Sequence, residues 1–236
     1  MSAKASLSRA AHLTAALAPY DWAWARENAA GIAAHWRRRL AERPALFNGR
    51  VLLANHVEIR GRTVAMRLFE TDFATFTAFR DLGFPDPAVV NVFAAVAPLS
   101  RDGAYLLGRM NAHTASAGQV YFACGTPDPS DVRPDGSVDL AASAVRELAE
   151  ETGLAPPEGA AEEWVLVRHG GHLALLRPVA MGEPAADLLA RAEAHLAAEE
   201  VPELAGLVVV RGPGDIDPSV MPAFVQAFLH DAFLLA

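Results

Sequence analysis

Residues Arg146–Leu154 read RELAEETGL, and this stretch decides the interpretation of the whole chain. Apolar spacing predicts a helix over 140–152, and Gly153 stands where a C′ glycine would end it. Residues at i, i+3 and i+4 share one face of a helix. Three acidic residues therefore fall on one arc: Glu147, Glu150 and Glu151. The other side is apolar and is predicted to pack on a sheet: Ala141, Ala144, Val145, Leu148 and Ala149.

Crowding carboxylates at this end of a helix is unfavourable. Like charges at these spacings repel by about 0.2–0.5 kcal/mol per pair. Negative charge in the last turn also opposes the helix dipole, by about 0.3–1 kcal/mol per group. A hard divalent cation would convert this repulsion into binding, since Mg²⁺ pairs carboxylates with substrate phosphates. A solvated acidic face is the alternative for an isolated Glu-Glu pair, but the full nine-residue string is more specific.

The nonamer resembles the second half of the Nudix box, Arg-Glu-aliphatic-x-Glu-Glu-x-Gly-aliphatic, at every position. Typical residue usage gives such a match by chance about once in 10⁷ windows. The resemblance extends over roughly 88–210. The first half of the box departs from the pattern, because its glutamate position falls on Val138 and its glycine position on Val132. If Gly125 is the box glycine, twenty residues precede Arg146 instead of thirteen, and Asp139 is expected to replace the missing glutamate.

The resemblance implies a divalent metal site and assigns roles to particular residues. Glu150 and Glu151 are implied as ligands of Mg²⁺ or Mn²⁺, and Glu147 as a further ligand or as the base that activates water. Arg146 is implied to orient the glutamates, and the carbonyl of Gly125 to add a ligand. Such proteins often recruit another acidic residue from beyond the box, here from Glu199, Glu200 or Glu203. We favour Glu203, which stands at the entrance of a predicted strand.

The expected fold class is α/β: a Nudix-type α/β/α sandwich with a mixed sheet, plus an N-terminal helix and β-hairpin extension. Alternating patterns predict a hairpin around Gly61 and another around Gly170-Gly171. Further strands are expected near 88–99, 103–111 and 119–125, and further helices over 184–199 and at the C-terminus. Prolines 85 and 87 suggest a division into an extension, 1–87, and a catalytic domain, 88–236.

Two N-terminal segments are predicted to be helical. The first residues, 1–19, faintly imitate a signal peptide, but their apolar run is short and broken, so an amphipathic helix is expected. Residues 21–42 carry an apolar stripe at helical spacing, with Asp21 as the expected N-cap. Core packing is the simpler explanation of this stripe. A dimer contact through Trp22 and Trp36 is the alternative.

Composition narrows the setting and the partners. The 236 residues carry a net charge of -8, which weighs against nonspecific nucleic-acid binding. The single cysteine, Cys124, forms no intrachain disulfide, and its neighbours favour a small buried thiol over a nucleophile. The longest apolar stretch is too short to span a bilayer. We therefore expect a cytoplasmic protein without nucleic-acid or membrane partners, with a homodimer as an open alternative to a monomer.

The predicted activity is hydrolysis of the diphosphate linkage of a nucleoside diphosphate joined to another moiety. A nucleotide-sugar such as UDP-glucose, or ADP-ribose, is the expected substrate, and Phe47, Phe73, Phe76 and Trp164 are candidates for stacking on a base. A catalytically quiet Nudix-fold module that senses a nucleotide is the alternative. His169 and His172 flank the second hairpin turn, where surface positions are expected.

Overall fold

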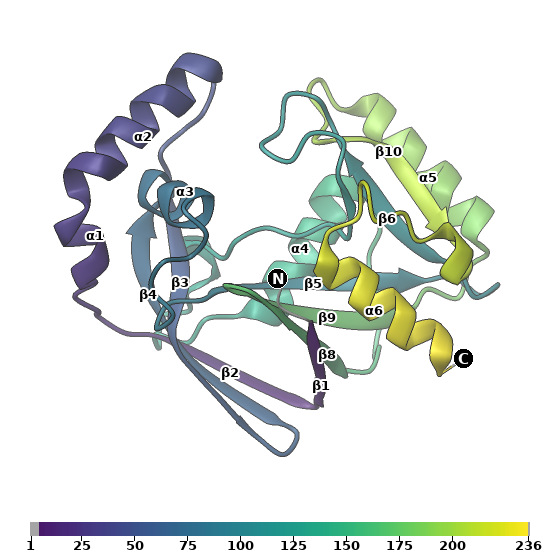
Figure 1. The fold of residues 1–236 in the computed structure, drawn as a ribbon. Helices are drawn as coiled ribbons and strands as arrows, with labels where there is room; N and C mark the ends of the chain where they lie inside the picture. The colour runs from purple at the N-terminus through teal and green to yellow at the C-terminus, as the bar shows by residue number, and fades with distance from the viewer. Residues whose placement is uncertain (1–4, 236) are drawn as a thin grey trace.

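A seven-stranded mixed sheet organises the computed structural model, which describes residues 5–235 (Figure 1). Its strands, in spatial order, are β1 (Ser6–Ala10), β8 (Trp164–His169), β9 (His172–Ala180), β5 (Asn91–Leu99), β6 (Tyr105–Met110) and β10 (Leu204–Val210), and the short β7 (Val120–Tyr121) pairs with β6. β5 and β9 run parallel, whereas the other neighbours in this sheet are antiparallel. The predicted mixed sheet is therefore confirmed.

Helices cover both faces of this sheet. Helices α4 (Leu140–Thr152) and α5 (Ala185–Ala198) pack on one face, and α6 (Ala223–Leu234) packs on the other. Strand β5 shows why, because its side chains alternate between two apolar cores. Val92, Ala94 and Val96 join the core beneath α4, while Phe93, Ala95 and Ala97 join the core beneath α6. This is the expected α/β/α sandwich.

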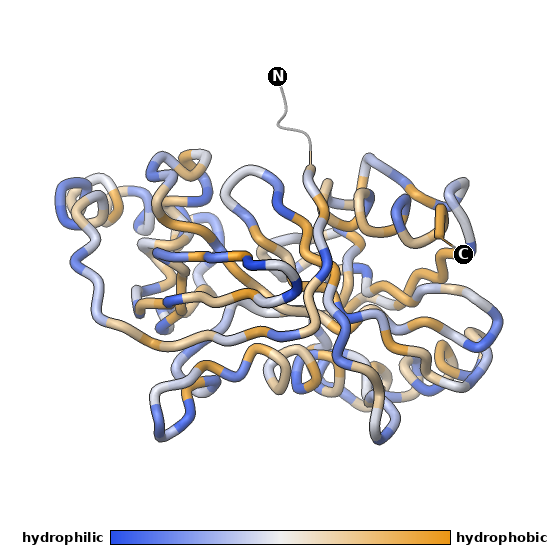
Figure 2. The backbone as a smooth tube through the Cα atoms, turned by 90° about the horizontal axis from the view of Figure 1, so that it is seen from below, coloured by the Kyte–Doolittle hydropathy of each residue, from blue (hydrophilic) through white to orange (hydrophobic). Residues whose placement is uncertain are grey.

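A second, three-stranded sheet lies beside the sandwich. It consists of β2 (His12–Leu17), β4 (Thr63–Asp72) and β3 (Arg50–Arg60), and helices α1 (Ala23–Glu27), α2 (Ala29–Glu42) and α3 (Phe73–Asp81) lie with it (Figure 1). One face packs against an aromatic cluster around Trp22 and Phe79, and the other joins the core beneath α4 through Leu52 and Leu68. In Figure 2, hydrophilic residues gather at the loops and hydrophobic stretches run through the interior.

The expectation of an N-terminal amphipathic helix over 1–19 is wrong. Its first four residues lie outside the described chain, and the rest forms β1 and β2. Strand β1 pairs with β8, and β2 runs parallel to β4, so both strands use partners distant in sequence. These edges supply backbone hydrogen bonds that local helix formation would not. The extension predicted over 1–87 thus shares β1 with the sheet of the main domain.

The helix predicted over 21–42 forms in two pieces. Asn28 interrupts it with φ -104° and ψ 12°, which separates α1 from α2. Asp21 does not cap it, because Trp22 occupies the N-cap position and Asp21 pairs with Arg26 instead. Trp22 is buried with its ring centroid 4.9 Å from that of Phe79, whereas Trp36 lies 6.2 Å from Phe73. Core packing, the simpler of the two explanations of the apolar stripe, therefore accounts for the position of Trp22.

Both predicted hairpins are present, with Gly61 and Gly170 at positive φ in their turns. Helix α3 begins at Asp72, whose side chain accepts a hydrogen bond from the Thr75 backbone N–H at 2.8 Å. The strand expected over 119–125 is much shorter, as only β7 pairs there. Two single-turn 3₁₀ helices, η1 (Pro129–Asp131) and η2 (Pro213–Asp215), complete the chain. Across residues 5–235, no helix combines the length and apolarity that a membrane crossing requires.

Candidate active site

Helix α4 occupies its predicted range because local signals define both ends. At the start, the Asp139 carboxylate accepts a hydrogen bond from the Ala142 backbone N–H at 3.0 Å. At the end, Gly153 adopts the left-handed conformation with φ 66°, and Leu154 after it is fully buried. The acidic residues of the nonamer are therefore held on a well-defined helix that packs on β5.

The acidic arc spans the boundary between core and surface. Glu150 is exposed, Glu147 is partly buried, and Glu151 lies in the interior with 8% of its surface exposed. Ala144 and Leu148 pack in the core as predicted, but Ala149 is exposed and does not pack on the sheet. Glu151 takes the inward direction instead, because it lies about 100° from Glu150 around the helix.

Arg146 ties these carboxylates together. Its Nη1 donates to Oε1 of Glu147 and to Oε2 of Glu150, both at 3.1 Å. Its Nη2 donates to Oδ1 of Asp131 at 2.9 Å. Partial burial lowers the pKa of Arg146, but the hydrogen bond and charge of Asp131, with the two glutamates, outweigh it and raise the pKa. These hydrogen bonds bring Arg146 to both glutamates, and its role in orienting them stays a prediction.

Asp131 is the partner of Arg146 that the sequence analysis missed. Its side chain is only 4% exposed, and its Oδ2 also accepts from Ser143 Oγ and from the Asp128 backbone N–H, both at 3.1 Å. The proposed substitute, Asp139, is instead the cap of α4 and pairs with Arg133. The Asp-Pro-Ser-Asp capping box around η1 was the available signal, since it fixes an aspartate in the loop before the helix.

Gly125 lies directly against Glu147. A Cβ atom added at Gly125 would come within 2.7 Å of Glu147 Oε1, so any larger residue would displace the carboxylate. The sequence prediction that Gly125 belongs with the acidic helix thus agrees with its position. The ligand role of its carbonyl stays a prediction.

Of the three candidates Glu199, Glu200 and Glu203, Glu203 is the one whose charge acts on the glutamates of the nonamer. It raises the pKa of both Glu147 and Glu151, and its backbone carbonyl accepts from the Asn111 backbone N–H at 2.8 Å, one residue before β10. Glu199 pairs with His195 at 3.1 Å instead. The placement therefore favours Glu203 over Glu199, while its ligand role stays a prediction.

Burial makes the carboxylates of this site costly to ionise. It raises the pKa of Glu147, with the charges of Glu150 and Glu203 adding to the effect and Arg146 opposing it. Burial, together with the charges of Glu147 and Glu203, raises the pKa of Glu151 to about 8. Oε2 of Glu151 is buried without any hydrogen-bond partner. A buried carboxylate oxygen without a donor is a group that a hard cation would satisfy, so the donor set fits a divalent metal.

The acidic side chains of this region do not form a preorganised metal site. Among the described residues, no group of three or more His, Cys, Asp or Glu side chains is placed to hold a metal ion. Nη1 of Arg146 lies 3.1 Å from both Glu147 Oε1 and Glu150 Oε2, so these two carboxylates are paired with a cation of the chain itself.

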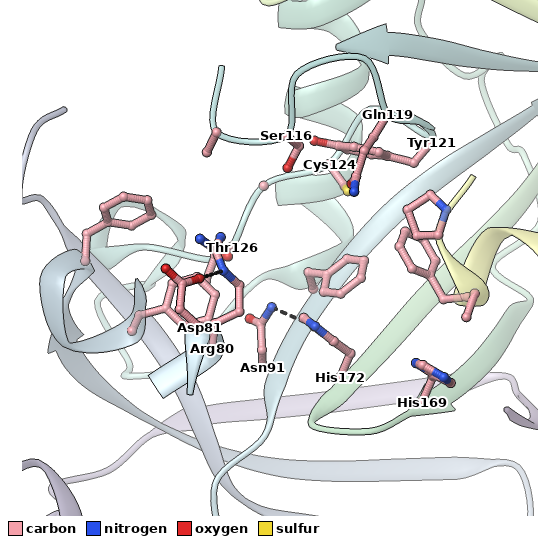
Figure 3. Close-up of a pocket in the computed structure, with 18 of the residues that line it drawn as sticks. Arg80, Asp81, Asn91, Ser116, Gln119, Tyr121, Cys124, Thr126, His169 and His172 are labelled. Carbon is pink, nitrogen blue, oxygen red and sulfur yellow. Dashed lines mark hydrogen bonds and ion pairs between the residues drawn. The ribbon is translucent and has the colours of Figure 1, made fainter. Parts of the chain in front are cut away.

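A cavity of about 640 Å³ lies beside Gly125, the residue that packs against Glu147 (Figure 3). Cys124, Gly125 and Thr126 line it on the side of α4, and Asn91 and His172 line it at the start of β5 and β9. The N-terminal helices form another wall with Arg39, Phe73, Phe76, Arg80 and Asp81. The cavity therefore lies between the extension and the main sheet, next to the candidate metal ligands.

Other candidate residues separate into core and cavity positions. Trp164 is 2% exposed in the core, and Phe47 is 83% exposed and outside the cavity lining, so of the four stacking candidates only Phe73 and Phe76 line the cavity. His169 and His172 are both partly buried and both line the cavity, which corrects the expected surface positions. Cys124 has intermediate exposure and lines the cavity. Burial, with the charges of Glu151 and Glu147, raises its pKa and favours the thiol over the thiolate, and its non-nucleophilic role stays a prediction.

No protein-family model and no curated protein matches this sequence. Solved structures with a similar arrangement include the MutT protein from Methanosarcina mazei Go1, at 19% identity and TM-score 0.39, over 61% of this chain and 92% of that one. A Nudix hydrolase from M. smegmatis, RenU, is 18% identical, with a TM-score of 0.37 over 61% of this chain and 83% of that one. The E. coli ORF135 protein is 22% identical, with a TM-score of 0.35 over 62% of this chain and 91% of that one. The functional assignment is therefore drawn from the site itself.

Proposed function

We propose that this protein is a divalent-metal-dependent hydrolase that cleaves the diphosphate linkage of a nucleoside diphosphate joined to another moiety. The observation that carries this proposal is the unpartnered, buried Oε2 of Glu151, on a helix that presents two further glutamates. One of these, Glu147, lies against Gly125, which lines a 640 Å³ cavity. A fold gains nothing from an unsatisfied buried carboxylate, so its persistence favours a functional role.

The residues divide the chemistry among them. Glu150 and Glu151, with Glu147, the Gly125 carbonyl and Glu203, would hold Mg²⁺ or Mn²⁺. When bound, the metal neutralises phosphate oxygens and lowers the pKa of coordinated water. Glu147 is the proposed base, because its raised pKa lies closer to the pKa of the water that it would deprotonate. Arg146, held by Asp131, positions Glu147 and Glu150.

The cavity suits a substrate with an anionic and an apolar part. Its volume falls within the roughly 300–1,000 Å³ typical of small-molecule sites. Arg39 and Arg80 on its wall bring cationic groups to a protein of net charge -8, with Asp81 offsetting part of that charge. A nucleotide-sugar such as UDP-glucose, or ADP-ribose, is the substrate class we propose. The extension, 1–87, would then be a part of the substrate site.

One observation favours the alternative, a quiet module that senses a nucleotide. Arg146 already neutralises Glu147 and Glu150, which leaves fewer free carboxylates for a cation. A cytoplasmic setting, the absence of nucleic-acid and membrane partners and a homodimer remain proposals that accompany either function.

The test is hydrolysis of a panel of UDP-glucose, ADP-ribose, a dinucleotide and a nucleoside triphosphate, with and without Mg²⁺. We expect wild-type turnover that requires the cation. Glu151→Gln keeps the fold but removes turnover, and Glu193→Gln, on the exposed face of α5, serves as the matched control. Full activity of Glu151→Gln would refute the assignment, and binding without turnover throughout the panel would establish the sensor.

A further inference from the structure

Two polar side chains meet in the cavity wall away from the acidic helix. Asn91 and His172 are the first residues of the parallel strands β5 and β9, and they are register partners. Nδ2 of Asn91 donates a hydrogen bond to Nδ1 of His172 at 3.2 Å, as Figure 3 shows. Both residues line the same 640 Å³ cavity as Gly125.

The amide oxygen of Asn91, Oδ1, accepts no hydrogen bond within residues 5–235. Asn91 is only 4% exposed, and its Oδ1 is buried without a hydrogen-bond partner. Leaving a buried acceptor unpaired costs about as much as losing a hydrogen bond. Such a group at the wall of a cavity is satisfied when a ligand brings an N–H donor.

His172 supplies the complementary group. Burial, with the charges of Arg80 and His169, lowers the pKa of His172 to about 4, so the imidazole is neutral near pH 7. A neutral imidazole has one donor and one acceptor nitrogen. Because Nδ1 accepts from Asn91, the proton lies on Nε2. The pair therefore combines an acceptor, Oδ1, and a donor, Nε2–H.

Aromatic rings surround this pair. Phe93 and Phe224 both line the cavity, with ring centroids 5.1 Å apart in a T-shaped arrangement. The His172 ring lies 6.1 Å from Phe93 and 4.6 Å from Phe84. Apolar aromatic walls with a few fixed polar groups are typical of sites for planar ligands.

The backbone fixes the pair in place. Phe84 is the one non-glycine residue at positive φ, 59°, among the described residues. Its ring occupies the space that a side chain at position 171 would need, so Gly171 lets Phe84 pack against the hairpin next to His172. Strained conformations that the surroundings maintain tend to occur at binding sites.

We propose that Asn91 and His172 are specificity-determining residues that bind the hydrogen-bonding edge of a nucleobase packed against Phe93 and Phe224. This rests on the proposed function, which brings a nucleoside diphosphate to the cavity with its diphosphate at the Gly125 end. A nucleobase presents a flat face to the aromatic walls and hydrogen-bonding atoms at its edge to the Asn91–His172 pair, whereas a sugar would leave the aromatic walls without a flat partner.

The test is equilibrium binding of UMP, AMP, CMP and GMP, compared with ribose 5-phosphate, which lacks a base. Calorimetry on the wild-type protein is expected to show at least one nucleotide binding about tenfold or more tightly than ribose 5-phosphate. Asn91→Ala should reduce that ratio to below about threefold and leave the ribose 5-phosphate affinity unchanged. Asn55→Ala is the matched control, because Asn55 also has a buried, unpartnered Oδ1 but lies outside the cavity lining.

An unchanged base preference in a folded Asn91→Ala protein would overturn the inference, as would wild-type protein that binds all four nucleotides no better than ribose 5-phosphate. Thermal unfolding of each variant checks the fold. Because binding needs no turnover, this outcome is separate from that of the hydrolysis panel. Turnover without base preference refutes only the base site, and base preference without turnover refutes only the hydrolase.

Discussion

At the scale of single residues, the site depends on how one arginine is anchored. Arg146 reaches two glutamates on its own helix, and within residues 5–235 Asp131, from the preceding loop, is the one ion-pair partner outside α4. Asp131 is buried and makes further hydrogen bonds of its own, whereas Arg146 is partly exposed. The anchoring aspartate is therefore the rigid member of the group.

Replacing that anchor should loosen the glutamates. Asp131→Asn removes the charge that holds Arg146, and we expect about 1–3 kcal/mol lower stability together with a fall in turnover of about tenfold or more. Glu158→Gln, at an exposed position in the loop after α4, should change neither. Denaturant unfolding and initial rates measure both quantities, and wild-type turnover in Asp131→Asn would show that the anchor is dispensable.

His172 should give stability a pH dependence on the acid side. Its folded-state pKa of about 4 lies below the ordinary histidine value of 6.5, so between these values the unfolded chain binds the proton more readily. The stabilisation is present above pH 6.5 and is lost as the pH falls towards 4, by on the order of 3 kcal/mol. His172→Gln should flatten this part of the urea-unfolding profile relative to wild type. His230→Gln, at an exposed position, should not.

At the scale of elements, the sequence predicts best where the signals are local. Helix α4 has its cap, Asp139, and its terminator, Gly153, beside it in the chain, and its predicted range is the observed one. Helix α2 and the strands of both hairpins also follow from local patterns. Strands β1 and β2 do not, because each depends on an edge supplied by distant residues. Asp131 was missed for the same reason, since it meets Arg146 across fifteen positions.

Helix α4 also depends on the backbone that crosses it at Gly125. Gly125→Ala should push the Glu147 carboxylate away, because the new Cβ would meet Oε1 at 2.7 Å. A flexible side chain can move, so we expect a stability change within about 1 kcal/mol but a loss of turnover of about tenfold or more. Gly214→Ala, with nothing within 4 Å of the added carbon, is the control. Unimpaired turnover in Gly125→Ala would separate Gly125 from the site.

At the scale of the whole molecule, the N-terminal segment and the sandwich form one structure around the cavity. Strand β1 belongs to the main sheet, the second sheet joins the core beneath α4, and the end of α2 bonds to the loop after β6 through Arg43 and the Thr114 carbonyl. Pro85 and Pro87 mark a turn, but residues before this turn contact residues after it in each of these three places. Local patterns cannot reveal these contacts, because they join segments far apart in the chain.

This integration predicts that N-terminal mutations destabilise the entire protein. Ala10 is fully buried at the end of β1, so Ala10→Asp places a charge in the core and should cost several kcal/mol, on the order of 3–5. Ser8→Asp, on the exposed part of the same strand, should cost less than about 1 kcal/mol. A single unfolding transition that is unchanged in Ala10→Asp would contradict the shared sheet.

The central claim is hydrolysis between the two phosphorus atoms of a nucleoside diphosphate derivative. ³¹P NMR of UDP-glucose and of ADP-ribose, incubated with the protein in the presence or absence of Mg²⁺, tests it most directly. We expect the diphosphate signals to be replaced by two phosphomonoester signals with wild-type protein and Mg²⁺, and to persist with Glu151→Gln. Diphosphate signals that persist with wild-type protein and Mg²⁺, although both nucleotides bind, would contradict the proposed function.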